Sequence, residues 1–464
     1  MVQRIKKFIA QRAIKKILYL VPHFSKENLI KLTYLAEKVM TRQDPCVHTA
    51  IKMTRMYFKQ DHPSLKLAER IITQLDKHCL YKLVENLFIN AMFRGVDKGK
   101  EFIQKYGFEP PWFMVISPTM RCNLNCKGCS TREYSKDTDL PFRVLDRVIS
   151  EAKQEIGMHF IVTQGGEMFL YEDMWKIYSK HNDVYFQVYT NGTLIDKECA
   201  RRIRKLGNIA PIISIEGFEK ETDERRGKGV YRKIMQAMDF LREEGVLFGA
   251  SITHSRLNHH VVTSEEFIDM LLEKGVYIVW YFQFLPIGKD PQFEFTPTPE
   301  QRRQLCKFVE KIRNSRPIFI GDFWNDGPFV GGCIAAGRRY FHINHKGDIE
   351  PCAFVHFAVD NIKKKSLIEA LQSPFFKYIR SKQPYTENLY APCMIIDNPW
   401  VLREAVKKAG AYPTHPGADK ILKSPLKEEI DRYSQVIHQI SAQDWERFKE
   451  QQKFQEEQIL ETSF

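Results

Sequence analysis

The chain has 464 residues, of which 43% are hydrophobic and 27% are charged, values typical of an ordinary soluble protein with two or three domains. The longest apolar run, Val276–Ile287, is well short of the ~20 residues that span a bilayer. The N-terminus has no signal-peptide pattern, and ten irregularly spaced cysteines do not indicate a disulfide framework, so we expect a reducing cytoplasm. The net charge of +13 favours an anionic partner, although we find no recognisable RNA-binding module and expect no nucleic-acid partner.

Helical periodicity dominates the first 110 residues. Residues 1–22 alternate apolar positions at helical spacing with lysines and arginines and contain no acidic residue. Such a helix either lies in an anionic membrane interface or packs on its own protein with a solvated basic face. From Lys26 to about Tyr106 the pattern predicts several further helices, in which Cys79 and Cys46 are expected to be buried thiols. We therefore predict an N-terminal all-α region over residues 1–110.

Strands and helices alternate from residue 111 to about 290. Six apolar runs read as buried strands, and the segments between them have helical spacing. Because crossover connections are right-handed, such repeats curve into an α/β fold of the partial (β/α)6 TIM-like barrel type. Active sites of such barrels form at the C-terminal ends of the strands. The expected strands are residues 112–119, 159–164, 183–190, 209–217, 246–253 and 276–285.

Three cysteines follow the first expected strand. Cys122, Cys126 and Cys129 have the spacing C-x3-C-x2-C, which is suited to a soft metal centre with one open corner. This loop resembles the cluster loop of the radical S-adenosylmethionine (SAM) superfamily. The resemblance implies that the three thiolates bind three irons of a [4Fe–4S] cluster, and that SAM chelates the fourth iron. Gly128 departs from the family, which usually has an aromatic residue there, and a partial zinc loop is the alternative.

Further motifs fall at the expected strand ends. Gly165-Gly166-Glu167 matches a family motif that contacts the SAM amino group, with Glu167 as the expected side-chain partner. By the same resemblance, Ser214 and Glu216 are expected near the SAM ribose or carboxylate. The turn 190–193 and the basic pair Arg225–Arg226 are either ordinary surface features or parts of the site. The segment 284–288, including Leu285, either packs on the adenine or belongs to the core.

A second set of cysteines lies nearer the C-terminus. Cys333, Cys352 and Cys393 surround a hairpin expected at 344–348, and they resemble the auxiliary-cluster domain called SPASM, or its shorter Twitch form. A full SPASM domain has more cysteines, so the resemblance implies at most one auxiliary [4Fe–4S] cluster. Its fourth ligand is open among Asp397, His356, another cysteine and a substrate atom, and structural thiols or zinc are the alternative. Cys199 and Cys306 are expected to be inert helical thiols.

The expected domains after the barrel (111–290) are a helical linker (291–327), the SPASM/Twitch-like domain (328–400) and a helical tail (401–464). The function implied by the resemblance is reductive cleavage of SAM to a 5′-deoxyadenosyl radical, which abstracts hydrogen from a peptide or from a lipid or isoprenoid. The implied partners are a reductant such as ferredoxin or flavodoxin and, through residues 1–22, the inner face of an anionic membrane. A non-catalytic iron–sulfur electron carrier or a zinc-stapled binding module is the rival interpretation.

Overall fold

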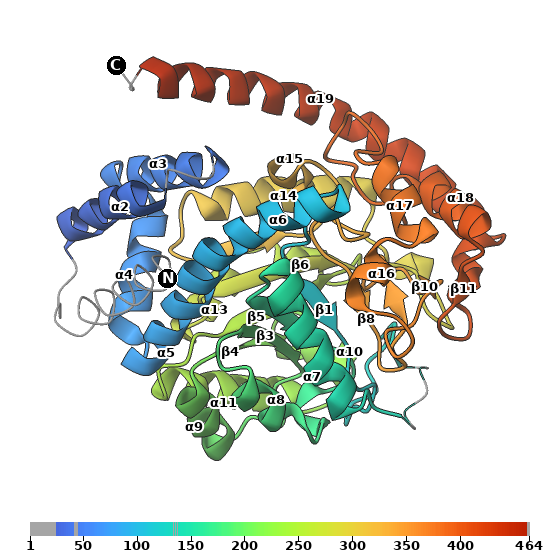
Figure 1. Cartoon of the computed structure of the whole chain (residues 1–464), viewed down its shortest axis with the longest axis horizontal. Coiled ribbons are helices and arrows are strands. Elements are labelled where there is room, and N and C mark those ends of the chain that lie inside the picture. Colours follow the sequence, from blue (N-terminus) through green and yellow to red (C-terminus); the bar gives the residue numbers. More distant parts are fainter. Residues whose placement is uncertain (1–24, 41–44, 133, 135, 137, 462–464) are drawn as a thin grey trace.

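The computed structural model describes residues 25–40, 45–132, 134, 136 and 138–461. The expected helix over residues 1–22 lies outside this part of the chain. The helical pattern from Lys26 to Tyr106 is confirmed, and one stretch of it is a π-helix (Figure 1). The elements are α2 (Lys26–Met40), α3 (Pro45–Lys59), α4 (Pro63–Gln74), α5 (Lys77–Leu83), the π-helix η1 (Val84–Arg94) and α6 (Gly95–Tyr106).

The helix α5 covers the amino-terminal end of the barrel. Asp76 caps it, since the Asp76 carboxylate accepts hydrogen bonds from the first free backbone N–H groups. Leu80 and Leu83 are buried in one apolar cluster with Tyr185 and Ala210. These two residues lie at the amino-terminal ends of two barrel strands. The helical region therefore closes the end of the barrel opposite to the cysteine loop.

The main sheet has nine strands in the order β7-β6-β5-β4-β3-β2-β1-β8-β9, and all neighbours are parallel except β8 and β9. All six strands predicted from the apolar runs are confirmed. They are β1 (Met114–Ile116), β2 (Phe160–Thr163), β3 (Tyr185–Thr190), β4 (Ile209–Ser214), β5 (Gly249–His254) and β6 (Ile278–Gln283).

The sheet continues beyond the six strands at both edges. The strand β7 (Phe319–Asp322) extends it past β6, within residues for which we predicted only a helical linker. At the other edge β8 (His342–Ile343) pairs with β1, and β9 (Ile349–Glu350) returns antiparallel to it. The expected hairpin is thus confirmed, and it is joined directly to the barrel sheet.

Helices cover the convex face of the sheet. Their apolar sides pack against the strands within the main buried core, as the near-continuous apolar strands require. The helix α9 shows how their ends are defined: Asp196 caps its start, and Gly207 ends it in the left-handed conformation. The elements are α7 (Phe142–Glu151), η2 (Ala152–Ile156), η3 (Met168–Leu170), α8 (Met174–Lys180), α9 (Lys197–Leu206), α10 (Glu219–Arg226), α11 (Val230–Glu243), α12 (His259–Val262), α13 (Glu265–Glu273), η4 (Phe293–Phe295) and α14 (Pro299–Arg313).

The C-terminal region packs beside the hairpin, and its last helix runs along the outside of the molecule (Figure 1). Arg303 of α14 donates to Asp444 of this helix, with one contact of 3.0 Å. The predicted helical tail also contains a two-residue strand at Tyr412–Pro413, which pairs antiparallel with Phe357–Ala358. No helix in the described residues is long and apolar enough to cross a membrane. The elements are α15 (Gly327–Val330), β10 (Phe357–Ala358), α16 (Leu367–Leu371), α17 (Pro374–Ser381), α18 (Pro399–Ala409), β11 (Tyr412–Pro413), η5 (Ala418–Leu422) and α19 (Leu426–Glu461).

Candidate active site

The cysteine loop leaves the C-terminal end of β1. Cys122, Cys126 and Cys129 are partly exposed free thiols. Burial raises the pKa of Cys122 and of Cys126, although a nearby arginine partly opposes it at Cys126. The loop is therefore placed as predicted, at the edge of the sheet where active sites of parallel barrels lie.

The glycines of Gly165-Gly166-Glu167 allow two backbones to meet. The Gly166 N–H donates to Thr119 O at 2.9 Å, and the Glu167 N–H donates to Arg121 O at 2.7 Å. A Cβ on Gly166 would lie 2.2 Å from Arg121 O, and one on Gly165 would lie 2.3 Å from Thr119 O. Only glycine fits this close approach, so the motif clamps the segment that leads into Cys122.

The Glu167 carboxylate, which follows β2, is hydrogen-bonded to the C-terminal end of β3. It is fully buried and accepts hydrogen bonds from Thr190 Oγ1 at 2.7 Å, from the Asn191 N–H at 2.7 Å and from the Phe169 N–H at 3.0 Å. Burial raises the pKa of Glu167, and these donors act against the shift. The structure thus gives Glu167 three bonds within the protein, and its contact with SAM stays a prediction.

The Thr190–Thr193 turn is part of the site. The Asn191 side chain donates to Asn123 Oδ1 at 2.8 Å and lies 3.8 Å from Cys122 Sγ. Asn123 in turn donates to Thr193 Oγ1 at 2.9 Å. Sequence reasoning left this turn undecided and did not consider Asn123, whose position directly after the first cysteine was the available signal.

Glu216, Arg225 and Arg226 form a buried group of ion pairs next to the cysteine loop. Glu216 is 1% exposed, and its Oε1 is bound by Arg226 through Nε at 2.9 Å and by Arg225 at 2.5 Å. Burial acts to lower the pKa of Arg226, but Glu216 and Cys126 outweigh it and the pKa is raised. Both arginines lie in the last turn of α10. The alternative interpretation, in which they belong to a solvated basic loop, is therefore wrong.

The end of α10 is fastened to the cysteine loop. The Lys127 N–H donates to Arg225 O at 2.9 Å, and Arg225 Nε donates back to Lys127 O at 3.3 Å. Oε2 of Glu216 is buried and has no hydrogen-bond partner among the described residues. The site therefore holds a carboxylate oxygen, beside three thiols, that is available to a cationic or hydrogen-bond-donating ligand.

The segment after β6 packs on the same loop. Gly128 has a left-handed φ of 66°, and a Cβ there would lie 2.6 Å from the Phe284 ring. Phe284 thus lies where a side chain at 128 would have to go, which explains the departure of Gly128 from the usual aromatic residue. Leu285 is buried in the main core, and Ser214 at the end of β4 is partly exposed.

The second cysteine set is also brought together. Cys333, Cys352 and Cys393 line one cavity of about 50 Å³, whose described lining carries no charged residue. Burial raises the pKa of the Cys352 thiol to about 12, and the Tyr340 hydroxyl lies 2.8 Å from its sulfur. Soft thiols in an enclosed apolar setting match the donor set of an iron–sulfur cluster.

Neither protein group suggested as a fourth ligand lines this cavity. Both oxygens of Asp397 bind Arg302, at 2.5 and 3.1 Å, and both side chains are fully buried. His356 is buried elsewhere, where its Nδ1 is bonded to His415. The remaining heteroatom side chains of the described lining are those of Trp324, Tyr340 and Met394.

The donor sets fit iron–sulfur clusters better than single ions. In the described residues, no three His, Cys, Asp or Glu side chains are grouped so that they could hold one metal ion. A cubane cluster does not require such a group, because each of its cysteines binds a different iron. Three thiols at each site, with the free Glu216 oxygen beside the first set, are compatible with a cluster and a ligand that carries an amino group.

Comparisons with known proteins agree with this site. The AdoMet-dependent heme synthase of Nitratidesulfovibrio vulgaris is 23% identical over 59% of this chain and 82% of its own. The PqqA peptide cyclase of Granulibacter bethesdensis is 25% identical over 53% of this chain and 68% of its own. The crystal structure of Streptococcus suis SuiB bound to precursor peptide SuiA has the same fold, with a TM-score of 0.54 at 16% identity, over 71% of this chain and 80% of that one.

Two family models match the chain. Residues 116–273 match the radical SAM superfamily, and residues 333–394 match the iron–sulfur cluster-binding SPASM domain. The first range spans the cysteine loop and the barrel, and the second contains all three cysteines of the cavity. The chain therefore contains a radical SAM domain and a SPASM domain, which imply a [4Fe–4S] cluster with SAM and an auxiliary iron–sulfur cluster.

Proposed function

We propose that Cys122, Cys126 and Cys129 hold the SAM-binding cluster, and that the enzyme forms a 5′-deoxyadenosyl radical which removes hydrogen from a peptide or a lipid substrate. The observation that carries this proposal is the loop itself, which is clamped by Gly166 on one side and by the Glu216 group on the other. When bound, the cluster supplies the electron that splits the SAM sulfonium bond.

The chain's own residues bind and orient SAM in this proposal. Glu216 Oε2 accepts a hydrogen bond from the SAM amino group, and Arg226 holds this carboxylate in place through its Oε1. The backbone of Gly165 and Gly166 forms the adjacent wall, and Ser214 and Leu285 lie toward the ribose and adenine.

Cys333, Cys352 and Cys393 hold one auxiliary [4Fe–4S] cluster in the proposal. Its fourth iron is left to a group other than cysteine, because the described cavity lining contains three cysteines. The auxiliary cluster can then receive the electron that a substrate radical releases. We assign residues 111–290 to the barrel and 328–400 to the auxiliary domain, with β7 and β8 completing the barrel sheet.

The finer partner assignments are also proposals. Radical SAM chemistry needs a reductant, for which ferredoxin or flavodoxin are the expected donors. Some relatives are named for peptides and others for haem synthesis, so they do not single out one substrate. Contact of residues 1–22 with an anionic membrane is tested by liposome retention of the full chain and of a chain without them.

The test is anaerobic cluster reconstitution, followed by iron analysis and a dithionite-driven assay for 5′-deoxyadenosine. The wild type should bind about eight irons and cleave SAM. Cys122→Ala should lose about half of the iron and all cleavage. The matched control is Cys199→Ala, a helical thiol of α9 outside both sites, which should retain both. Zinc in place of iron, without SAM cleavage, would refute the proposal and support a binding module.

A further inference from the structure

The concave face of the sheet carries an aromatic surface. The rings of Tyr189 on β3 and Phe282 on β6 lie 5.9 Å apart, although β4 and β5 separate their strands. Rings from such distant strands can meet only on the concave side of a curved sheet. This surface begins close to the cluster loop, because Asn191, two residues after Tyr189, is the residue that approaches Cys122.

The same surface reaches the auxiliary cysteines. The Phe282 ring lies 5.2 Å from Phe323 and 6.2 Å from Phe354. Both of these rings line the cavity that contains Cys333, Cys352 and Cys393. One continuous aromatic surface therefore connects the two cysteine sites, in the space where a substrate must meet both.

The concave face is accessible as well as aromatic. Along β6, the inward Trp280 and Phe282 are partly exposed, whereas the outward Val279 and Tyr281 are buried. A barrel filled by its own side chains would bury its inward residues at least as completely as its outward ones. The inward face of β6 is thus partly open to solvent.

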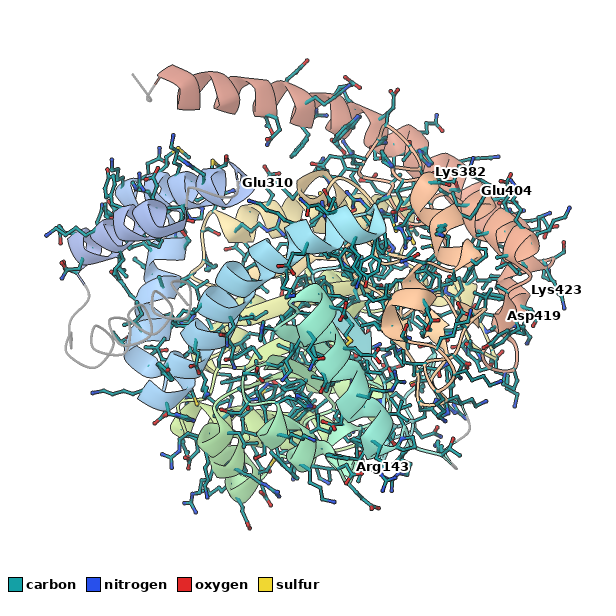
Figure 2. The ribbon with its side chains drawn as sticks, viewed as in Figure 1. Arg143, Glu310, Lys382, Glu404, Asp419 and Lys423 are labelled. Carbon is teal, nitrogen blue, oxygen red and sulfur yellow. The ribbon has the colours of Figure 1, made fainter. Side chains whose placement is uncertain are left out.

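The neighbouring inward positions are small and uncharged. Strand register places Ser214, Ser251, Trp280 and Gly321 in one row across four strands. A Cβ on Gly321 would lie 2.5 Å from the Trp280 ring, so glycine makes room for the indole. None of these four residues is charged, and the charged side chains labelled in Figure 2, Arg143, Glu310, Lys382, Glu404, Asp419 and Lys423, lie at the periphery of the molecule.

We propose that the part of the substrate that enters the barrel is a large apolar surface, a hydrocarbon chain or an uncharged ring system, and not a polar peptide. The aromatic side chains of this surface gain free energy when a ligand removes their apolar area from water. They would leave the amides and charges of a peptide without partners. This proposal rests on the proposed function, of which it names the substrate class.

The test measures binding to the reconstituted full chain by equilibrium dialysis. The probes are geranylgeraniol as an isoprenoid, protoporphyrin IX with both propionates esterified as an uncharged ring system, and a charged decapeptide. Phe282→Asp should weaken binding of the apolar probe by about tenfold or more. Trp280→Ala removes aromatic surface without adding charge, and it should weaken binding too if Phe282→Asp does not fold. The matched surface control is Leu257→Asp, at a side chain that is 68% exposed, and it should bind as the wild type does.

Saturable binding of geranylgeraniol or of the esterified protoporphyrin IX, with this pattern in the variants, would support the proposal and identify the kind of apolar group. Binding of the decapeptide alone would overturn it, as would apolar binding that neither barrel variant changes. SAM cleavage is measured in parallel on the same samples. Cleavage without apolar binding counts against this inference only, whereas apolar binding without cleavage counts against the proposed function.

Discussion

Gly166→Ala tests whether the glycine motif acts as a clamp on the cysteine loop. The added Cβ would lie 2.2 Å from Arg121 O and 2.6 Å from the Met120 carbonyl carbon. Because such contacts are not tolerated, one of the two segments must move by about 1 Å. That movement breaks or lengthens the hydrogen bonds of Thr119 O and Arg121 O to the glycine segment. Two hydrogen bonds at about 1 kcal/mol each, with added strain, give a loss of about 2–4 kcal/mol in the free energy of unfolding.

The loss should fall on the barrel cluster, because Cys122 directly follows Arg121. We expect Gly166→Ala to bind about four irons in place of about eight, and to form little 5′-deoxyadenosine. Urea unfolding measures the stability. Gly410→Ala is the control, since Gly410 also has a positive φ but no atom within 4 Å of its added Cβ. Full iron binding by Gly166→Ala with weakened SAM affinity alone would refute the clamp and leave the motif as a SAM contact.

Three further changes test the buried charges and the second site. Arg226→Met should lower the midpoint potential of the SAM-free barrel cluster, because it removes a cation beside the thiols and leaves Glu216 with one arginine, Arg225, in place of two. An EPR-monitored titration with an unchanged midpoint would contradict this. Asp397→Asn should lower the free energy of unfolding, measured with urea, by about 3–5 kcal/mol, because the charge of the fully buried Arg302 is then uncompensated. A decrease of less than about 1 kcal/mol would show that the ion pair is dispensable. Cys352→Ala should remove about four irons and keep SAM cleavage, and loss of cleavage would link the two clusters.

The barrel was predictable from sequence because each strand is a short apolar run with its own flanking turn. The exception is β7, whose first residue, Phe319, is 47% exposed and which follows the long helix α14 closely. Local pattern therefore gave little indication of a strand. The hairpin of β8 and β9 was visible from its turn, but its pairing with β1 joins Val115 to His342. A local sequence pattern cannot indicate that two strands so far apart in the chain pair with each other.

The cysteines of both sites were identified from their spacing and a family resemblance, whereas their supports were not. Glu216 was recognised as a strand-end residue, but its bonds to Arg225 and Arg226 depend on α10, a helix that was not predicted from the sequence. Asp397 was considered as a metal ligand because it lies close to Cys393 in the chain. Its pairing with Arg302, on another helix, could be seen only in three dimensions.

The pairing of β8 with β1 has a consequence for how the chain folds. During synthesis β1 emerges early, yet one of its two edges is completed only when His342 and Ile343 are available. Until then Val115 and Ser117 expose N–H groups that later bind Phe341 O at 2.9 Å and Ile343 O at 2.8 Å. An open parallel edge beside an unfilled cysteine loop is a site for mispairing with other chains. Such long-range closure is slow, so folding of the barrel is expected to finish only after the C-terminal hairpin has docked.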